Sequence, residues 1–219
     1  MIEIKNLLDT SKTIAKEIFE NKTYPFEVLP EIGEFILKLQ KTLDENEFNV
    51  SDGNVYIHKS VKVYETANIF GPCIIDEGTE VRPGAFIRGN AIVGKNCVVG
   101  NSTELKNVII FDNVQVPHYN YVGDSVLGFK SHMGAGSITS NVKSDKTLVK
   151  VKDGEKIIET GLKKMGAVLG DNVEVGCNSV LNPGTIVGRQ SNIYPLSCVR
   201  GTVPANSIFK AQGNIVEKY

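Results

Sequence analysis

The chain has 219 residues, of which 41% are hydrophobic and 7% aromatic, and it contains no tryptophan. Its formal net charge of -1 and pI near 6.3 give no global attraction to nucleic acid or to an anionic membrane, so we expect neither as a partner. No run approaches the roughly 18 apolar residues of a membrane span, and the N-terminus lacks the order of a signal peptide, which together predict a cytoplasmic protein.

Residues 1–52 show the spacing of amphipathic helices. Ile14, Ile18 and Phe19 mark one segment, expected to begin near residues 9–11. A second segment begins at Pro30, a residue suited to a first helical turn. It places five apolar side chains on one face: Ile32, Phe35, Ile36, Leu39 and Leu43. Because a solenoid needs its open end covered, we expect a helical cap on the first coil of the repeats that follow. The alternative is an arm that docks a partner.

A period of six residues begins at Ile57 and continues without a miss to Leu105. Its aliphatic positions are Ile57, Val63, Ile69, Ile75, Val81, Ile87, Val93, Val99 and Leu105. A small or β-branched residue follows four positions later, at Val61, Ala67, Cys73, Thr79, Ala85, Ala91, Cys97 and Thr103. This period is neither the 3.6 of a helix nor the alternation of a half-exposed strand, so it predicts a solenoid of short strands and corners. The aliphatic ladder would be the core, at about 1.5–3 kcal/mol per fully buried side chain.

The period changes in two places after Leu105. It slips to five residues, giving Ile110, Val116 and Val122, and slips again to Leu127 and Met133. It is absent from about residue 142 to residue 166, where segments 147–151 and 156–160 flank Asp153 and Gly154, a hairpin signal. The ladder resumes at Leu169 and continues to Val199. We therefore predict two domains, a helical cap over 1–52 and a β-solenoid over 53–219, with an inserted loop at about 142–166.

Polar and aromatic side chains gather where the period first slips. His118 lies in the stretch PHYNYVGD, residues 117–124. Other candidates stand near predicted corners, and several would share one corner column if the coils stack in register: Arg88, Glu104, Lys106, Tyr121, Asn141 and Lys164. Arginine and lysine bind phosphate, and a histidine with a pKa near 6.5 accepts a proton, so the set suits an anionic substrate whose nucleophile must lose a proton. The alternative is that these cations are ordinary solvated corner residues.

Three ordered stretches carry a specific resemblance: GNSTELK at 100–106, PHYNYVGD at 117–124 and GAGSITSN at 134–141. Over about residues 55–215 the chain resembles the acetyltransferase domain of the bifunctional N-acetylglucosamine-1-phosphate uridyltransferases. It also resembles the archaeal-type sugar-1-phosphate nucleotidylyltransferases, which have a similar lysine-rich insertion after the Gly-Ala-Gly motif. The resemblance implies an all-β solenoid, a left-handed parallel β-helix, assembled as a homotrimer with active sites between subunits. It also implies acetyl-CoA as co-substrate, with no metal required for acetyl transfer.

The resemblance also implies roles for single residues of the acceptor site. His118 would be the general base that deprotonates the sugar amine, with Glu104 and Asn141 orienting the base and the sugar. The implied sugar-phosphate ligands are Arg88, Lys106 and Tyr121, and Lys164 matches a phosphate-binding lysine after the insertion. Arg88 stands three hexapeptides before Lys106, as in the family, although Arg82 has the more family-like Arg-Pro-Gly-Ala context. His132 stands where many members carry an asparagine that touches the sugar.

On the donor side, the resemblance assigns the Ala135 amide to the thioester carbonyl of acetyl-CoA. Cys177 stands where the family commonly has serine, and Lys210 would reach a phosphate of coenzyme A. The family's nucleotidyltransferase domain, with its glycine-rich basic loop, has no counterpart in these 219 residues. We therefore expect no nucleotidyltransferase activity from this chain.

The function predicted from the sequence is an acetyl-CoA-dependent N-acetyltransferase in nucleotide-sugar or cell-envelope precursor synthesis. Its acceptor would be glucosamine- or galactosamine-1-phosphate, or a related nucleotide-linked amino sugar. One alternative is a non-catalytic β-helix that binds a sugar phosphate or a protein partner, beside a separate nucleotidyltransferase. Another is a zinc enzyme on the same fold, which needs three convergent histidines, whereas His118 and His132 are far along the chain from His58. The four cysteines lack C-x-x-C or zinc-like spacing. Cys73 and Cys97 occupy the small position of the repeat, so packed free thiols are expected.

Overall fold

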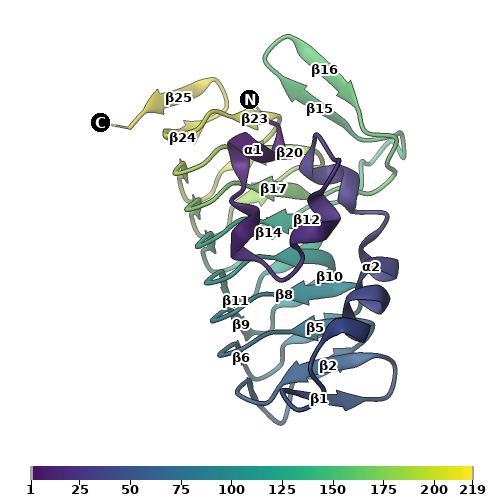
Figure 1. The fold of residues 1–219 in the computed structure, drawn as a ribbon. Helices are drawn as coiled ribbons and strands as arrows, with labels where there is room; N and C mark the ends of the chain where they lie inside the picture. Colours follow the sequence, from purple (N-terminus) through teal and green to yellow (C-terminus); the bar gives the residue numbers. More distant parts are fainter. Residues whose placement is uncertain (1, 219) are drawn as a thin grey trace.

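The hexapeptide repeats form a left-handed parallel β-helix, which confirms the predicted fold class. The structure is a computed structural model and describes residues 2–218. Each coil has three faces, and strands of successive coils pair in parallel with one another (Figure 1). The described part of the chain also has an N-terminal arm, residues 2–46, and a hairpin near the C-terminal coils.

We name the three faces by what lies on them. The covered face consists of β2 (Val55–His58), β5 (Cys73–Ile75), β8 (Ala91–Val93), the second halves of β10 (Glu104–Ile110) and β12 (Tyr121–Leu127), β17 (Ala167–Leu169), β20 (Thr185–Val187) and β23 (Thr202–Val203). The polar face consists of β4 (Asn68–Phe70), β7 (Phe86–Arg88), the first halves of β10 and β12, β14 (Ile138–Thr139), β19 (Val180–Leu181) and β22 (Cys198–Val199).

The third face is a nine-stranded sheet. Its strands are β3 (Lys62–Val63), β6 (Glu80–Val81), β9 (Val98–Asn101), β11 (Gln115–His118), β13 (His132–Met133), β18 (Glu174–Val175), β21 (Asn192–Ile193), β24 (Ser207–Ala211) and β25 (Asn214–Glu217). All of these pairings are parallel except the last, in which β25 folds back antiparallel on β24.

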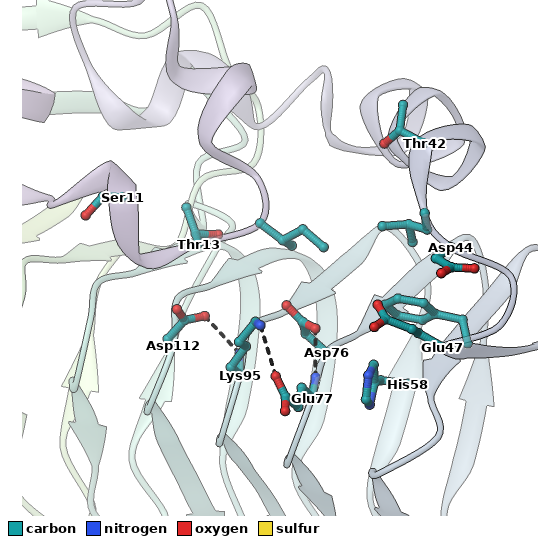
Figure 2. A pocket seen from close by; sticks show the side chains of 13 residues that line it. Ser11, Thr13, Thr42, Asp44, Glu47, His58, Asp76, Glu77, Lys95 and Asp112 are labelled. Carbon is teal, nitrogen blue, oxygen red and sulfur yellow. Dashed lines mark hydrogen bonds and ion pairs between the residues drawn. The ribbon is translucent and has the colours of Figure 1, made fainter.

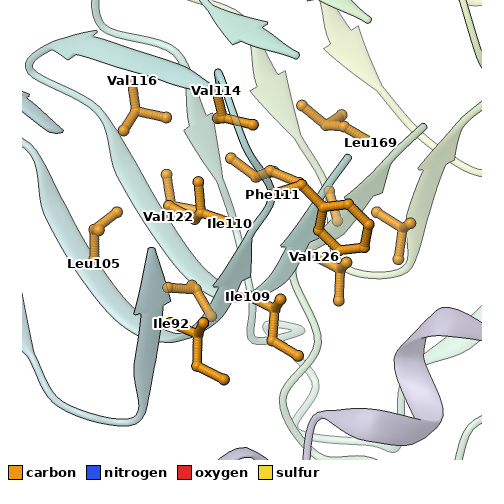
Figure 3. Packing of buried hydrophobic residues seen from close by; sticks show 14 of the residues in the cluster. Ile92, Leu105, Ile109, Ile110, Phe111, Val114, Val116, Val122, Val126 and Leu169 are labelled. Atoms are coloured by element: carbon orange, nitrogen blue, oxygen red, sulfur yellow. The ribbon is translucent and has the colours of Figure 1, made fainter. Parts of the chain in front are cut away.

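The inward aliphatic ladder is the core of the solenoid (Figure 3). Leu105, Ile110, Val116 and Val122 are all fully buried. The five-residue steps do not break this ladder, because Val99 still pairs with Val116 and Leu105 with Val122. They shorten these coils instead: Val99 and Val116 are 116 − 99 = 17 positions apart, where Val81 and Val99 are 99 − 81 = 18 apart.

A second apolar ladder points outward on the covered face. In β5, β8, β17 and β20 all three residues are buried, as expected for strands covered on both sides. The outward members, all fully buried, are Ile74, Ile92, Ile109, Val126, Val168 and Ile186. The N-terminal arm covers this face, and its helix α2 (Ile32–Leu39) contacts β8 and β10.

The position expected for the N-terminal segment is therefore wrong. The arm does not stack on the open end of the first coil but extends along the side of the solenoid, from near its C-terminal coils to its first coils. Backbone contacts mark its course: the Asp171 amide donates to Leu7 O at 3.0 Å, and the Asp112 amide donates to Lys12 O at 3.0 Å. The physical reason is the outward ladder, which would otherwise expose a stripe of isoleucine and valine to water.

Within the arm, the helix expected after Pro30 is confirmed as α2, with Ile32 and Ile36 buried. The segment around Ile14 and Phe19 forms 3-10 turns instead of one helix. The arm's other elements are α1 (Ile4–Leu7), η1 (Thr10–Lys12), η2 (Lys16–Phe19), η3 (Pro25–Val28) and η4 (Gln40–Thr42). The first coil is covered by β1 (Phe48–Ser51), which pairs antiparallel with β2. The division at residue 52 stays a prediction.

The hairpin expected in the insertion is present. It consists of β15 (Lys150–Asp153) and β16 (Lys156–Glu159), paired antiparallel. It projects beside the C-terminal coils (Figure 1), and Thr202 donates a hydrogen bond to the Lys152 carbonyl. None of the helices described for residues 2–218 has the length and apolar character needed to cross a membrane.

Candidate active site

The candidate residues of the polar face begin with an ion pair between two neighbouring coils. Arg88, at the end of β7, donates from Nη1 to Oε1 of Glu104 at 2.6 Å. This hydrogen bond raises the pKa of the Arg88 guanidinium above its usual value. The β7 and β10 register also places Arg88 opposite Lys106, whereas Arg82 pairs with Glu80 after β6 on the third face. Of the two candidate arginines, Arg88 is therefore the one that lies beside Lys106 on the polar face.

Asp124 is the centre of the second group. It lies at the corner where β12 turns from the polar to the covered face, with a positive φ of 47° and only 4% exposure. Its carboxylate accepts from Lys106 Nζ at 3.2 and 3.3 Å and from Asn107 Nδ2 at 3.0 Å. It also accepts from Asn141 Nδ2 at 2.5 Å. Asp124 therefore fixes both Lys106 and Asn141, a role that our sequence analysis missed although Asp124 ends the PHYNYVGD stretch.

Tyr121 joins this group through Asn141. Its Oη accepts from Asn141 Nδ2 at 3.1 Å, and burial raises the pKa of the Tyr121 phenol. The phenol is therefore neutral, and its own proton stays available for a donated hydrogen bond. Gly123 makes this pairing possible, because a Cβ there would lie 2.5 Å from Tyr121 Oη and 2.9 Å from Asn141 Nδ2.

His118 lies at the corner between the third face and the polar face. It is exposed at the end of β11, three residues before Tyr121 begins β12. The strand register places Ala135 beside His118 on the next coil, and the Gly136 amide donates to His118 O at 3.0 Å. Continuing the register places Cys177 beside Ala135. The structure thus aligns His118, Ala135 and Cys177 in one column, which we call the donor column.

Asn120 holds the His118 corner and was also missed from the sequence. Its Oδ1 accepts from the His118 amide at 3.1 Å, and its Nδ2 donates to Gly134 O at 2.9 Å and Ser137 O at 3.0 Å. Asn120 is 2% exposed, so it acts as a buried bridge between two successive corners of the donor column. An asparagine two residues after a histidine gives little warning of this role in the sequence.

Several predicted residues lie outside this arrangement. His132 is on the third face, where its Nδ1 is 2.8 Å from Glu174 Oε2, so the structure does not bring it to the polar cluster. Lys210 lies in β24, near the C-terminal end of the solenoid. Lys164 is exposed but lies near Asn141, because the amide of the next residue, Met165, donates to Asn141 O at 3.0 Å.

The implied roles of Glu104 and Asn141 in orienting the base have no contact to support them. Among the hydrogen bonds of residues 2–218, Glu104 pairs with Arg88, and the Asn141 side chain pairs with Tyr121 and Asp124. None of these bonds involves the His118 ring, so both roles stay predictions.

A separate cavity lies between the arm and the first coils. A space of about 670 Å³ opens between the arm, β1 and the first coils, and Figure 2 shows its lining. Most of its charged residues are acidic: Asp76, Glu77 and Asp112 lie around Lys95, which pairs with Glu77 at 3.0 Å. It contains none of the predicted site residues.

All four cysteines are free thiols, as expected, but only two of them are buried. Cys73 and Cys97 are buried, and burial raises the pKa of each thiol to about 12. Cys177 and Cys198 are exposed. Within residues 2–218, no three or more histidine, cysteine, aspartate or glutamate side chains are grouped so that they could hold a metal ion.

Comparison with known proteins gives a family match for most of the solenoid. Residues 69–203 match the family model described as the GMPPB C-terminal domain. A bifunctional sugar-1-phosphate nucleotidylyltransferase/acetyltransferase of Sulfurisphaera tokodaii is 33% identical over 186 residues, covering 77% of this chain and 46% of that protein. The bifunctional protein GlmU of Methanococcus maripaludis is 36% identical over 195 residues, covering 87% and 47%. The chain thus spans about half the length of these curated relatives.

Among solved structures, the comparison matches the acetyltransferase domain of PglB from Neisseria gonorrhoeae in complex with acetyl coenzyme A. It is 15% identical, with a TM-score of 0.35, and the match covers 75% of this chain and 58% of that one.

Proposed function

The chain belongs to the GMPPB C-terminal domain family, and on that premise we propose that it is an acetyl-CoA-dependent N-acetyltransferase acting on an amino-sugar 1-phosphate. The acceptor would be glucosamine- or galactosamine-1-phosphate. One observation carries the proposal. The donor column of His118, Ala135 and Cys177 runs along the corner that precedes β12, and β12 begins at Tyr121, which belongs to the polar cluster. The name of the Sulfurisphaera tokodaii relative, which includes an acetyltransferase function, supports it.

In the proposed reaction the amine nitrogen of the sugar attacks the thioester carbonyl carbon of acetyl-CoA. His118 accepts the proton that the amine loses, the carbon–sulfur bond breaks, and coenzyme A leaves as a thiolate that takes up a proton. The backbone amide of Ala135, on the coil next to His118, would donate to the carbonyl oxygen as negative charge develops on it. His118 is exposed, so its imidazole is accessible to the amine from which it would accept the proton.

The cations of the polar face suit the phosphate of the acceptor. Arg88 and Lys106 lie opposite each other on adjacent coils, and the Glu104 and Asp124 carboxylates hold them in place. Charge-assisted hydrogen bonds from such groups to phosphate are among the stronger polar contacts in proteins. The Tyr121 phenol and Lys164 would complete the contacts. Because these residues lie on an open face, we also propose a homotrimer in which a neighbouring subunit closes each site. We further propose that this trimer is cytoplasmic.

The experiment that tests this function is a thiol-release assay with acetyl-CoA and each of the two amino-sugar 1-phosphates. The wild type should turn over at least one of them, and His118→Ala should lose roughly 10²–10⁴-fold in rate, the usual contribution of a general base. His58→Ala is a matched control, because His58 is a partly exposed histidine of the first coil that bonds to Ser60. Near wild-type turnover by His118→Ala would contradict its role as base. A wild type silent on both sugars would favour either a different acceptor, such as a nucleotide-linked amino sugar, or the non-catalytic binding function.

A further inference from the structure

A basic cleft lies beyond the residues assigned above, between the hairpin and the coil corners that follow β19 and β22. It has a volume of about 480 Å³ and is lined by Lys143, Lys150, Lys152, Asn182, Arg200 and Gln212, with Pro183 and Gly201. Four of these side chains are cations and no carboxylate lines the cleft. This is the composition expected of a site for a multiply charged anion.

The hairpin supplies two of the cations through a simple alternation. Val149 and Val151 are fully buried, so Lys150 and Lys152 point to the opposite side of the strand. The hairpin is also fixed against the solenoid: a Cβ at Gly184 would lie 2.7 Å from Lys150 O, and Gly184 has a φ of 83°. The two lysines are therefore held over the coil corners by packing and do not lie on a free loop.

The charge of the cleft is only partly balanced. Lys143 pairs with Asp145 at 3.3 Å, and Lys150 pairs with Glu159 at 2.7 Å. The ion pairs of residues 2–218 include neither Lys152 nor Arg200. Two cations of the cleft thus have no partner carboxylate within ion-pair distance among the described side chains.

The cleft lies in line with the proposed acceptor residues and away from the donor column, so its position favours binding of the acceptor over binding of acetyl-CoA. The strand register continues from Lys106 through Gly123 and Ser140 to Asn182 and then Arg200. At about 4.8 Å per coil, the cleft begins one coil beyond Asn141 and extends over the next. The donor column lies at the other end of the same short strands, since Cys177 precedes β19 whereas Asn182 follows it.

We propose that this basic cleft binds the diphosphate of a nucleotide-linked amino sugar, so that the acceptor of the reaction is a nucleoside diphosphate amino sugar. The inference rests on the proposed acetyltransferase function and names its substrate class. With this acceptor, Lys152 and Arg200 would hold the phosphates in place of Arg88 and Lys106, and the sugar would extend along the column of Lys106 toward His118.

Calorimetric titration with uridine diphosphate tests the cleft without any acetyl transfer. The wild type should bind it, and Lys152→Ala/Arg200→Ala should bind it roughly 100-fold more weakly, because each charge-assisted bond to phosphate contributes on the order of tenfold. Lys38→Ala/Lys41→Ala, two exposed lysines at the end of α2 and in η4, is the matched control and should bind as the wild type does. Saturating coenzyme A should leave the binding unchanged.

Three results would overturn the inference: no binding of uridine diphosphate by the wild type, equal binding by the cleft variant, or displacement by coenzyme A. Kinetics separate the inference from the proposed function. If the wild type acetylates an amino-sugar 1-phosphate but does not bind uridine diphosphate, the function stands and the cleft assignment fails. If it binds uridine diphosphate at Lys152 and Arg200 but acetylates no amino sugar, the cleft stands and the acetyltransferase fails.

Discussion

The covered face and the polar face are built from the same backbone ladder but differ in the residues that point outward. On the covered face these residues are Ile74, Ile92, Ile109 and Val126, and the arm buries them completely. On the polar face the outward residues include Arg88, Glu104, Lys106 and Tyr121, which pair with one another or with corner side chains. Because the inward ladder already supplies a core to each coil, the outward positions are free to serve either packing or chemistry.

β10 and β12 show the contrast within single strands, since each begins on the polar face and ends on the covered face. The change occurs at Asn107 and Asp124, both with positive φ. Asn107 Nδ2 donates to Asp124 Oδ1 at 3.0 Å and to Leu29 O of the arm at 3.1 Å. The corner therefore joins the arm physically to the cluster around Lys106. Substitutions on one face can thus test whether the other face is affected.

The largest effect should come from breaking the covered face at Ile36, which is fully buried in α2. Ile36→Asp places an unpaired carboxylate against the outward ladder and should cost more than about 4–5 kcal/mol. The arm should detach, which limited proteolysis within residues 2–46 would detect together with a lower Tm. Leu37→Asp is the control, because Leu37 is 42% exposed on the same helix and should tolerate the charge. Equal protease resistance of the two variants would contradict the covering role of the arm.

Breaking the polar face at its buried centre should have the next largest effect. Asp124→Ala removes the carboxylate that holds Lys106, Asn107 and Asn141. We expect a loss of about 3 kcal/mol, the lower end for breaking a buried pair, because the Lys106 side chain keeps 27% exposure. Denaturant unfolding measures the loss. Asp145→Ala is the control: its ion pair is 57% exposed on its acidic side, so the substitution should leave stability nearly unchanged.

A matched pair of isoleucines compares the two faces directly. Ile109 is fully buried under the arm, while Ile138 points outward from β14 on the polar face and is only partly buried. Ile109→Ala should destabilise by about 2–5 kcal/mol through lost burial and the cavity left behind, and Ile138→Ala by less than half as much. Chemical denaturation of the two variants measures the difference. Equal losses would mean that both faces are packed alike.

The sequence predicted the inward core and the hairpin because both are local patterns. The six-residue period positions every inward side chain, and Asp153 with Gly154 sits between two runs of strand-forming residues. The course of the arm was not predicted, although a signal existed. Triplets such as Cys-Ile-Ile at 73–75 and Ala-Ile-Val at 91–93 place two neighbouring apolar residues where a strand open to water would need only one.

The candidate site was predictable only in part, for a similar reason. Motif and register gave Arg88, Lys106 and Tyr121 as one group, and the structure brings them together. Asp124 and Asn120 were missed, because each acts through contacts to residues on a neighbouring coil or corner that only the folded chain brings close. His132 was included by resemblance alone, and the corner geometry separates it from the others.

The smallest effect should come from Tyr121→Phe, which removes one hydroxyl from the polar face. Because Tyr121 Oη accepts a single described hydrogen bond, from Asn141, we expect a stability loss of about 1 kcal/mol. If the phenol also donates to the acceptor phosphate, the KM for the amino sugar should rise up to about tenfold while the KM for acetyl-CoA stays unchanged. Steady-state kinetics with each substrate varied in turn separates the two. A rise in the KM for acetyl-CoA alone would move Tyr121 to the donor side, and unchanged constants for both substrates would leave it a purely structural partner of Asn141.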